Sequence, residues 1–441
     1  MSRAVGNCSL LKAIGKRGYS TQVAIKPISP DINVGISTNQ VRLVAAYPNY
    51  PLSKVSLTYK AGARYELPDN LGITHILRQG AVLSTQELTS FSLHRVPSQL
   101  GFNLYASVDR EAFTYSVEAH PNAISSAVEY LVNVATKPSF KPWELSDNVK
   151  RIKLDLLGIP SEVKALDLLH KAAYRNALGN SLFCDSSRVD RLTCEHCWNF
   201  VNDHFTTSRA QITSTSLTQA ELEKIIPKFD LESGSGPATL KSVYTGGEQR
   251  VSDFKEYNTY IAVAGEAPGF TQKDYLSFAV LQHVYANNPG LKYGTGQSIL
   301  NKALSKAGVI GAVTGIYANY SDSSLVGFFL AVSNSDAVKG YDAVLNAFLK
   351  SDITDQDVAK AKTFYKNSLL DSAYGTGIVD LLAKQIAADT IISPLKAADA
   401  VDAVTTADVK QAAKKLLSGK LAVGAYGGDV ASLPYIDTIK K

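Results

Sequence analysis

The sequence contains little charge and no long apolar run. Only 19% of its 441 residues are Asp, Glu, Lys or Arg, below the roughly 25% usual for soluble globular domains, which indicates that part of the surface is buried against partner proteins. A membrane-spanning helix needs about 20 apolar residues, and the best candidate runs only from Leu325 to Ser335, between Asp322 and Asp336. We therefore expect any membrane association to be peripheral. The length predicts two or more domains, and 45% hydrophobic residues exclude a disordered polyampholyte.

Acidic residues are absent before Asp31. Four basic residues lie in the first 21 positions: Arg3, Lys12, Lys16 and Arg17. A basic segment with serines and without the apolar core of a secretory signal is typical of a mitochondrial presequence. We expect residues 1–19 to be this presequence and residues 20–37 to form an extended arm. Removal of the presequence lowers the formal net charge from +5 to +1, which argues against a nucleic-acid partner.

Cysteine is scarce, with four residues in the whole chain. Loss of the presequence removes Cys8 and leaves three, an odd number that fits a reducing compartment. The segment Cys194-Glu-His-Cys197 has the spacing of a metal or redox motif, but a structural zinc needs four ligands and no second pair follows. We interpret this segment as the start of an amphipathic helix and assign neither cysteine a role.

A helix is expected from Leu71 to Gly80. Asn70 can cap it, and its apolar residues recur at the spacing of one helix face: Ile73, Ile76 and Leu77. In the H-x-x-E-H motif of zinc peptidases, two histidines on one face of such a helix bind one zinc ion and the Glu acts as general base.

The same frame here reads His75, Arg78 and Gln79. Arg78 places a permanent cation where the motif needs a carboxylate, and Gln79 is a neutral amide that binds zinc poorly. The other histidines are dispersed along the chain. The sequence therefore predicts no bound metal and no catalytic residue, with His75 as a packed helix histidine.

Strand and helix patterns alternate along the chain. Half-buried strands are expected at 41–45 and 54–59, and a hairpin at 102–108 and 113–118. Further helices are expected at 90–95, at 121–136 and onward to about residue 205. This order predicts an α+β fold with a mixed sheet backed by helices.

The chain also repeats itself. The segment Val189-Asp-Arg-Leu-Thr193 reappears 212 residues later as Val401-Asp-Ala-Val-Thr405. At about the same shift, the strand near 113, the helix near 127 and the helix start near 143 map onto 325–330, 338–344 and 354–357. We predict two tandem homologous domains, residues 38–231 and 246–441, joined by a linker at 232–245 that is rich in turn-forming residues.

The sequence around the motif resembles that of a known protein family. Gly62-Ala-Arg-Tyr-Glu66 and Asn70-Leu-Gly72, ahead of His75, resemble the opening of the mitochondrial processing peptidase family of inverted-motif zinc proteases. Three later stretches resemble its non-catalytic branch, the core proteins of ubiquinol-cytochrome c reductase (respiratory complex III): 115–118, 168–178 and 202–206. The similarity runs over nearly the whole chain, and it implies that the two domains form a bowl.

The resemblance also implies where the remaining functional groups would lie. In the family, the second domain supplies an Arg and a Tyr from the motif R-G-L-x-Y, but the matching segment here is Ala307-Gly-Val-Ile-Gly311. Ala307 replaces the Arg and Gly311 replaces the Tyr. The distal zinc-ligand Glu of the family falls where Asp155 is the nearest acid and Glu162 the next. Two separate sites are therefore predicted to be lost.

The resemblance implies a non-catalytic structural subunit on the matrix side of the mitochondrial inner membrane, without a cofactor of its own. Its implied partners in a dimeric complex are a homologous core protein 1, cytochrome b, cytochrome c1 and the iron-sulfur protein. One alternative is the alpha subunit of the processing peptidase, which grips presequences with a long glycine-rich loop; here Gly290–Gly296 is only a short glycine-rich turn. The other alternative, an active metallopeptidase, conflicts with both lost sites.

Overall fold

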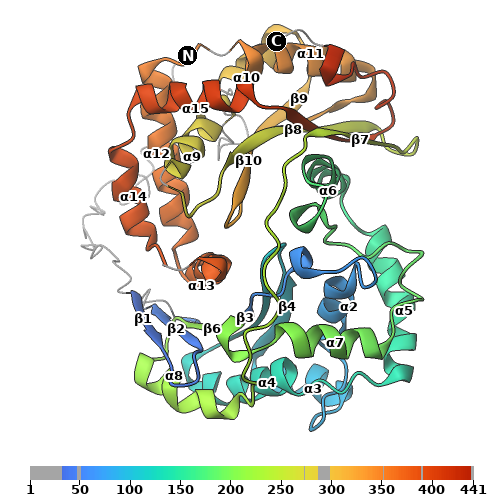
Figure 1. Ribbon diagram of the computed structural model, residues 1–441, viewed down its shortest axis with the longest axis vertical. Helices are drawn as coiled ribbons and strands as arrows, with labels where there is room; N and C mark the ends of the chain where they lie inside the picture. The colour runs from blue at the N-terminus through green and yellow to red at the C-terminus, as the bar shows by residue number, and fades with distance from the viewer. Residues whose placement is uncertain are drawn as a thin grey trace, which may run out of the picture.

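The computed structural model describes residues 32–46, 51–272, 274–286, 298–350, 352–388 and 391–438. The expected presequence and the glycine-rich turn at 290–296 lie outside the described residues. Figure 1 shows two lobes, each built on one sheet, with most helices on the sides that face away from the other lobe. The first lobe runs from β1 to α8, and the second lobe begins at β7.

The sheet of the first lobe has six strands in the order β1-β2-β6-β3-β5-β4. Their bounds are β1 Ile32–Ile36, β2 Arg42–Ala46, β3 Ser53–Tyr59, β4 Phe102–Val108, β5 Phe113–Ala119 and β6 Ala210–Ser214. β2 and β6 run parallel and all other neighbours antiparallel, so the sheet is mixed, as predicted. The expected strands are confirmed, and the described end of the expected arm forms the edge strand β1.

Strand β3 differs from the expectation of one wet face. All seven of its residues are buried, including the polar Lys54, Ser56 and Thr58. The reason is that a helix of the second lobe covers the face that would otherwise meet water. Sequence alternation alone therefore misjudged how deeply this strand is buried.

The helices of the first lobe lie mainly between the strands in sequence. Their bounds are α2 Ile73–Gly80, α3 Ser90–Leu100, α4 Ile124–Thr136, α5 Pro142–Leu157, α6 Ser161–Ala173, α7 Cys194–His204 and α8 Gln219–Ile225. The expected helices at 71–80, 90–95 and 121–136 are confirmed, the last with a short turn at 121–123 ahead of α4.

The sheet of the second lobe has five strands in the order β7-β11-β8-β10-β9. Their bounds are β7 Gly247–Ser252, β8 Asn258–Pro268, β9 Gly311–Asn319, β10 Ser323–Ser333 and β11 Leu421–Gly427. β7 and β11 run parallel and the other neighbours antiparallel. This order repeats β2-β6-β3-β5-β4 strand for strand, including the single parallel pair, so the predicted duplication is confirmed.

The helices of the second lobe repeat those of the first. Their bounds are α9 Tyr275–Tyr285, α10 Ile299–Lys306, α11 Ala337–Leu349, α12 Asp355–Ser372, α13 Gly377–Ala383, α14 Pro394–Asp402 and α15 Thr406–Ser418. α4 corresponds to α11 and α5 to α12, as the sequence shift predicts. The two copies of the repeated motif end at Thr193 and Thr405, which cap α7 and α15.

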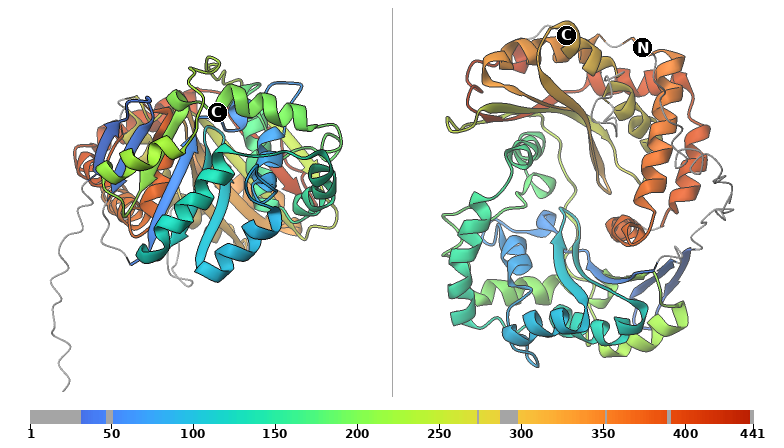
Figure 2. Two further views of the ribbon diagram at one scale, coloured as in Figure 1. Left: turned by 90° about the horizontal axis from the view of Figure 1, so that it is seen from below. Right: turned by 180° about the vertical axis from the view of Figure 1, so that it is seen from behind.

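The lobes exchange one helix each. α6 of the first lobe packs on β7, β8 and β11 of the second sheet, and α13 of the second lobe packs on β2, β3 and β6 of the first (Figures 1 and 2). Five fully buried apolar residues form the second contact: Val44, Ala46, Ile378, Val379 and Leu382. At the first contact, a Cβ added at Gly424 of β11 would lie 2.2 Å from the backbone nitrogen of Leu169 in α6. Each sheet is thus covered on both faces.

Polar contacts join the lobes at the turn between β9 and β10. Arg64 of the first lobe donates to Asp322 at this turn and to Glu111, and both Arg64 and Glu111 are buried. The hydroxyl of Tyr320 lies 2.8 Å from Nε2 of His170 on α6. Burial, with the charge of Arg110 nearby, lowers the pKa of His170 to about 3, so this histidine is neutral near pH 7.

The segment expected as a linker crosses from one lobe to the other in extended form. Its backbone is held by side chains of the first lobe, because Arg209 donates to the carbonyl of Pro237 and Arg64 to that of Leu240. The exact domain boundaries stay a prediction. Within the described ranges, no helix has both the length and the apolar character that a membrane span requires.

Candidate functional site

The motif helix α2 begins without a capping side chain of its own. Its N-cap is Gly72, with φ 92°, and not the expected Asn70, whose Oδ1 accepts a hydrogen bond from the amide of Leu67 instead. The buried carboxylate of Glu66 takes the capping role by accepting from the amides of Gly72 (2.7 Å) and Thr74 (2.9 Å). A left-handed glycine at this position allows the chain to turn into the helix.

Glu66 caps the motif helix, a role that the sequence did not predict. Burial raises its pKa to about 7, although the hydrogen bonds from Gly72 and Thr74 act in the opposite direction. A sequence signal for it exists in retrospect: a helix that starts at a glycine needs an acceptor from elsewhere for its first amides. Only the fold shows that Glu66 provides it.

The three motif positions converge on a single carboxylate. His75 Nε2 and Arg78 Nη2 each lie 3.0 Å from Oδ2 of Asp155 on α5, and the Gln79 side chain hydrogen-bonds to the same residue. The sequence alone gives Arg78 and Gln79 no such partner, because Asp155 lies 77 residues beyond Arg78 in the chain and only folding brings it next to both.

His75 is held in one tautomer by its two neighbours. The backbone amide of Cys184 donates to its Nδ1 at 3.4 Å, so the ring proton lies on Nε2 and is donated to Asp155. The His75 side chain is fully buried. Burial lowers its pKa, and the charge of Arg78 lowers it further, against the opposing effect of Asp155. His75 is therefore a neutral hydrogen-bond donor.

Asp155 is ionised in this arrangement. Burial acts to raise its pKa, but the hydrogen bond from His75 and the charge of Arg78 together hold it below the ordinary value. The Asp155 and Arg78 side chains are 38% and 31% exposed, so their ion pair borders on solvent. The site is a cation, a carboxylate and a neutral imidazole joined by hydrogen bonds.

These residues do not fit a catalytic zinc ion. Such a site needs three protein ligands with free lone pairs around one cation, but His75 Nε2 carries a proton and Arg78 brings a positive charge into the same space. In the part of the chain that the structure describes, no group of three or more His, Cys, Asp or Glu side chains could hold a metal ion. The general base of the motif is also missing, since Arg78 cannot accept a proton.

The structure places Cys194 and Cys197 in the first turn of α7. Thr193 and His196 form the capping box of α7, which explains the polar residues around Cys194. Cys197 is buried in the core of the first lobe, where burial raises its pKa to about 12. A thiol with a raised pKa is a poor nucleophile and metal ligand.

The two positions in the second lobe lie at the end of α10 and the start of β9. Ala307 is the C-cap of α10. Gly311 is the first residue of β9 and pairs with Val332 of β10. A Cβ added at Gly311 would lie 2.6 Å from Val332 Cγ1 and 2.7 Å from the carbonyl oxygen of Ala331. A tyrosine at this position would therefore require the strand or its neighbour to shift.

A cavity of about 440 Å³ lies beside the start of α2. Its walls include Gly72 and Cys184 of the first lobe, Lys164 of α6 and Tyr426 of β11. Lys164 Nζ lies 3.1 Å from the Tyr426 hydroxyl and 4.8 Å from the centre of its ring. Both lobes thus close the space next to the motif helix.

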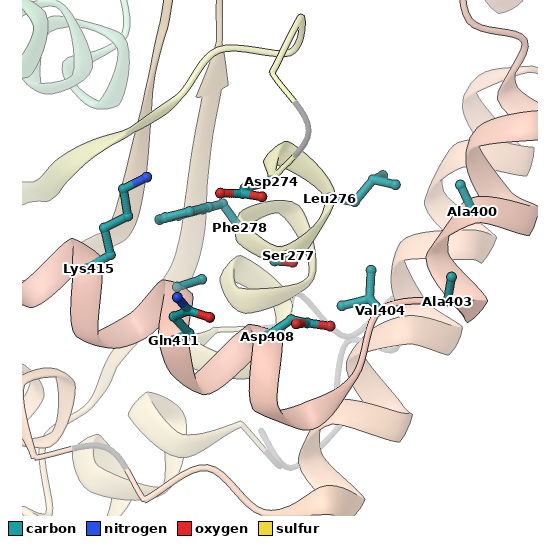
Figure 3. Close-up of a pocket in the computed structure, with 11 residues that line it drawn as sticks. Asp274, Leu276, Ser277, Phe278, Ala400, Ala403, Val404, Asp408, Gln411 and Lys415 are labelled. Atoms are coloured by element: carbon teal, nitrogen blue, oxygen red, sulfur yellow. The ribbon is translucent and has the colours of Figure 1, made fainter.

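A second cavity, of about 410 Å³, lies between α9, α14 and α15 of the second lobe (Figure 3). Its polar lining includes Asp274, Asp408 and Lys415. The Asp408 carboxylate is engaged in the capping box of α15, where it accepts from the amide of Thr405 at 2.8 Å. This cavity is formed by helices that carry none of the motif positions.

Comparison with known sequences gives two family matches. Residues 43–186 match the profile described as Insulinase (Peptidase family M16). Residues 191–365 match the profile described as Peptidase M16 inactive domain. The two matches fall on the two copies of the duplicated fold.

Relatives that match along nearly the whole chain include proteins of two kinds. Cytochrome b-c1 complex subunit 2, mitochondrial, of Mus musculus is 31% identical over 408 residues, which cover 90% of this chain and 90% of that protein. The protein of the same name from Neurospora crassa is 28% identical over 419 residues, with 90% and 89% covered. Probable mitochondrial-processing peptidase subunit alpha-2 of Arabidopsis thaliana is 27% identical over 423 residues, with 89% and 81% covered.

Proposed function

The chain belongs to peptidase family M16, and from that premise we propose that it is core protein 2 of the mitochondrial cytochrome b-c1 complex, respiratory complex III. It is a structural subunit that supports assembly and stability of the complex. It carries no peptidase chemistry and no redox chemistry of its own. Its relatives named cytochrome b-c1 complex subunit 2 support this assignment with 30–31% identity over 90% of the chain in three mammals.

One structural observation supports the proposed lack of peptidase activity. The three motif positions His75, Arg78 and Gln79 all bind the same carboxylate, that of Asp155. The groups that would coordinate a metal and activate water are thereby engaged with one another. The protein is an inactive peptidase homologue in which the motif helix has kept its packing and exchanged its chemistry for an ion pair.

The proposed partners follow from the complex. We expect the chain to pair with a homologous core protein 1 and to contact the subunits cytochrome b, cytochrome c1 and the iron-sulfur protein in a dimeric assembly. We place it on the matrix side of the inner membrane, held there by its partners. We further propose that residues 1–19 are a presequence, so that the mature chain begins at Ser20. The low charged fraction of 19% supports a surface that is largely covered by protein.

The alternative is a substrate-binding alpha subunit of the mitochondrial processing peptidase. The Arabidopsis relative supports it with a match of similar extent but lower identity. The short length of the glycine-rich segment 290–296 in the sequence argues against it, because a loop that grips presequences needs greater length. In either case the chain itself is not the catalytic subunit.

A native gel of detergent-solubilised mitochondrial membranes separates the two assignments. The gel is probed for this chain, stained for haem and assayed for cleavage of a presequence peptide. Co-migration with the haem-stained band is the expected result. Co-migration with presequence cleavage, away from haem, would support the alternative and overturn the proposal.

Two further measurements test the location. Extraction of the membranes with alkaline carbonate is expected to release the chain without detergent, and protease treatment of mitoplasts is expected to leave it intact. Digestion in intact mitoplasts would exclude the matrix side. N-terminal sequencing of the mature chain tests the start at Ser20.

A further inference from the structure

The carboxylate of Asp155 on α5 contacts all three motif positions of α2. It lies on the last turn of α5 and receives hydrogen bonds from His75, Arg78 and Gln79 on one face of α2. In an H-x-x-E-H zinc site, a metal ion stands between two imidazoles of one helix and an acid from elsewhere. Here α2 and α5 are joined without a metal ion, because the Arg78 guanidinium of α2 binds the Asp155 carboxylate of α5.

The charges in this cluster are balanced without a metal. An ionised carboxylate next to a buried ring needs a positive partner, because an unpaired charge in a poorly solvated site is costly. Arg78 lies one turn after His75 on the same helix face, so its guanidinium reaches the carboxylate that His75 also contacts. A guanidinium carries its charge at any physiological pH and donates from several nitrogens in a fixed plane.

We propose that the Arg78 guanidinium takes the place of a metal ion in this site, holding α5 against α2 through Asp155 and excluding a divalent cation from the position. The inference rests on the proposed function only for the absence of peptidase chemistry. It does not depend on the complex in which the chain assembles. A native gel without co-migration would therefore overturn the proposed function and leave the role of Arg78 to be decided by the measurements below.

The hydrogen bonds of the motif site exclude a metal ion, as the charge of Arg78 does. His75 Nδ1 accepts from the Cys184 amide, and Nε2 donates to Asp155. A metal at this position would have to displace that proton, break the contact between Arg78 and Asp155, and then lie beside a guanidinium. Removal of Arg78 alone takes the cation away from the Asp155 carboxylate and removes the repulsion of a metal ion.

Zinc titration tests the exclusion. The full chain carrying Gln79→His has two imidazoles in the motif but keeps Arg78; a second variant carries Gln79→His together with Arg78→Gln. Isothermal titration with zinc chloride is expected to show one zinc bound by the double variant, with at least tenfold higher affinity than the single variant. Equal affinities, or no zinc bound by the double variant, would overturn the claim that the guanidinium keeps the metal out.

Hydrogen exchange tests the holding role. In the full chain, Arg78→Gln is expected to increase the exchange rates of the amides in the last turns of α5 and in α2, whereas Arg78→Lys retains a cation and much of the protection. Arg151→Gln, which removes an exposed guanidinium from α5 itself, is the matched control. Unchanged exchange in Arg78→Gln, or an equal increase in the control, would contradict the proposal.

The pKa of His75 tests the charge of Arg78 separately from its packing. The charge of Arg78 lowers the pKa of His75 and Asp155 raises it. In Arg78→Gln the pKa of His75 is therefore expected to rise, as followed by NMR of its ring proton. A pKa that stays the same would show that the guanidinium does not act on this ring.

Discussion

The ammonium nitrogen of Lys54 lies 2.8 Å from both carboxylate oxygens of Asp380, and this pair joins β3 of the first lobe to α13 of the second. The Lys54 side chain is 2% exposed, whereas that of Asp380 is 52% exposed. Burial lowers the pKa of Lys54, but the hydrogen bond and charge of Asp380, with Tyr105, raise it above the ordinary lysine value. The exchanged helix α13 thus carries the counter-ion for a buried charge in the other lobe.

The first prediction concerns this pair. Asp380→Ala is expected to lower the free energy of unfolding by about 1–3 kcal/mol, because it removes the nearer carboxylate from a buried ammonium and leaves it with Glu118, at 3.2 Å, and Tyr105. Lys54→Met is expected to cost less, because the carboxylates that remain are reached by water. Urea denaturation of the full chain measures both, with the exposed Asp399→Ala as control. A larger loss in Lys54→Met than in Asp380→Ala would contradict the argument.

The second prediction concerns the close approach of α6 to β11. Gly424→Ala places a Cβ 2.2 Å from the Leu169 nitrogen and 2.5 Å from the Ala165 carbonyl oxygen, so α6 has to move away from the second sheet. Overpacking of this kind costs about 1–3 kcal/mol, which a thermal melt detects. Gly419→Ala is the matched control, since its Cβ meets only the Leu416 carbonyl oxygen, at 3.5 Å. Equal melting temperatures for the two variants would argue against the close approach.

The third prediction concerns pH. The pKa of Glu66 is raised from 4.5 to about 7 in the folded protein, so the folded state binds this proton more tightly than the unfolded state does. The stabilisation is complete below about pH 4.5 and is lost as the pH rises through 7, by up to about 3 kcal/mol.

Glu66→Gln cannot titrate, so it isolates this effect. The difference in unfolding free energy between wild type and Glu66→Gln is expected to shift against the wild type between pH 5 and pH 8. Glu162→Gln, at an exposed position on α6, controls for the general effect of removing a carboxylate. A difference that is constant over this range would mean that Glu66 does not titrate with a raised pKa.

The fourth prediction concerns restored peptidase activity. The double variant Arg78→Glu and Gln79→His rebuilds the motif in the first lobe but leaves Ala307 and Gly311 unchanged. Loss of one group that stabilises a developing oxyanion costs roughly 100- to 1,000-fold in kcat. We expect zinc-dependent cleavage of a presequence peptide to stay at least that far below the rate of a catalytic family member. Full activity, abolished by a chelator, would show that the second lobe is not a separate lost site.

Much of the fold could be predicted because its signals are local. The strand at 113–118 and the helix at 121–136 follow from alternation and helical spacing within a few residues. The duplication follows from Val189–Thr193 and its copy at 401–405. The loss of the motif at Arg78 and Gln79 can likewise be read from the residue types, since neither side chain can do what a Glu or a His does there.

What the local pattern could not predict depends on residues far apart in the chain. The capping of α2 by Glu66 was missed because the sequence offered Asn70 as a nearer cap. The burial of both faces of β3 was missed because the covering helix α13 belongs to the other lobe.

By itself, the sequence determined the tandem α+β architecture and the loss of the groups that a zinc peptidase needs, since spacing and side-chain chemistry are properties of short segments. Only the tertiary structure decided what replaced them. Folding brings Asp155 on α5 to His75 and Arg78 on α2, and it places α6 and α13 on each other's sheets. The physical reason is that an ionised carboxylate needs hydrogen-bond donors and an apolar sheet face needs apolar neighbours. Elements that are distant in the sequence supply both, so only the packing of the whole chain determines which residues they are.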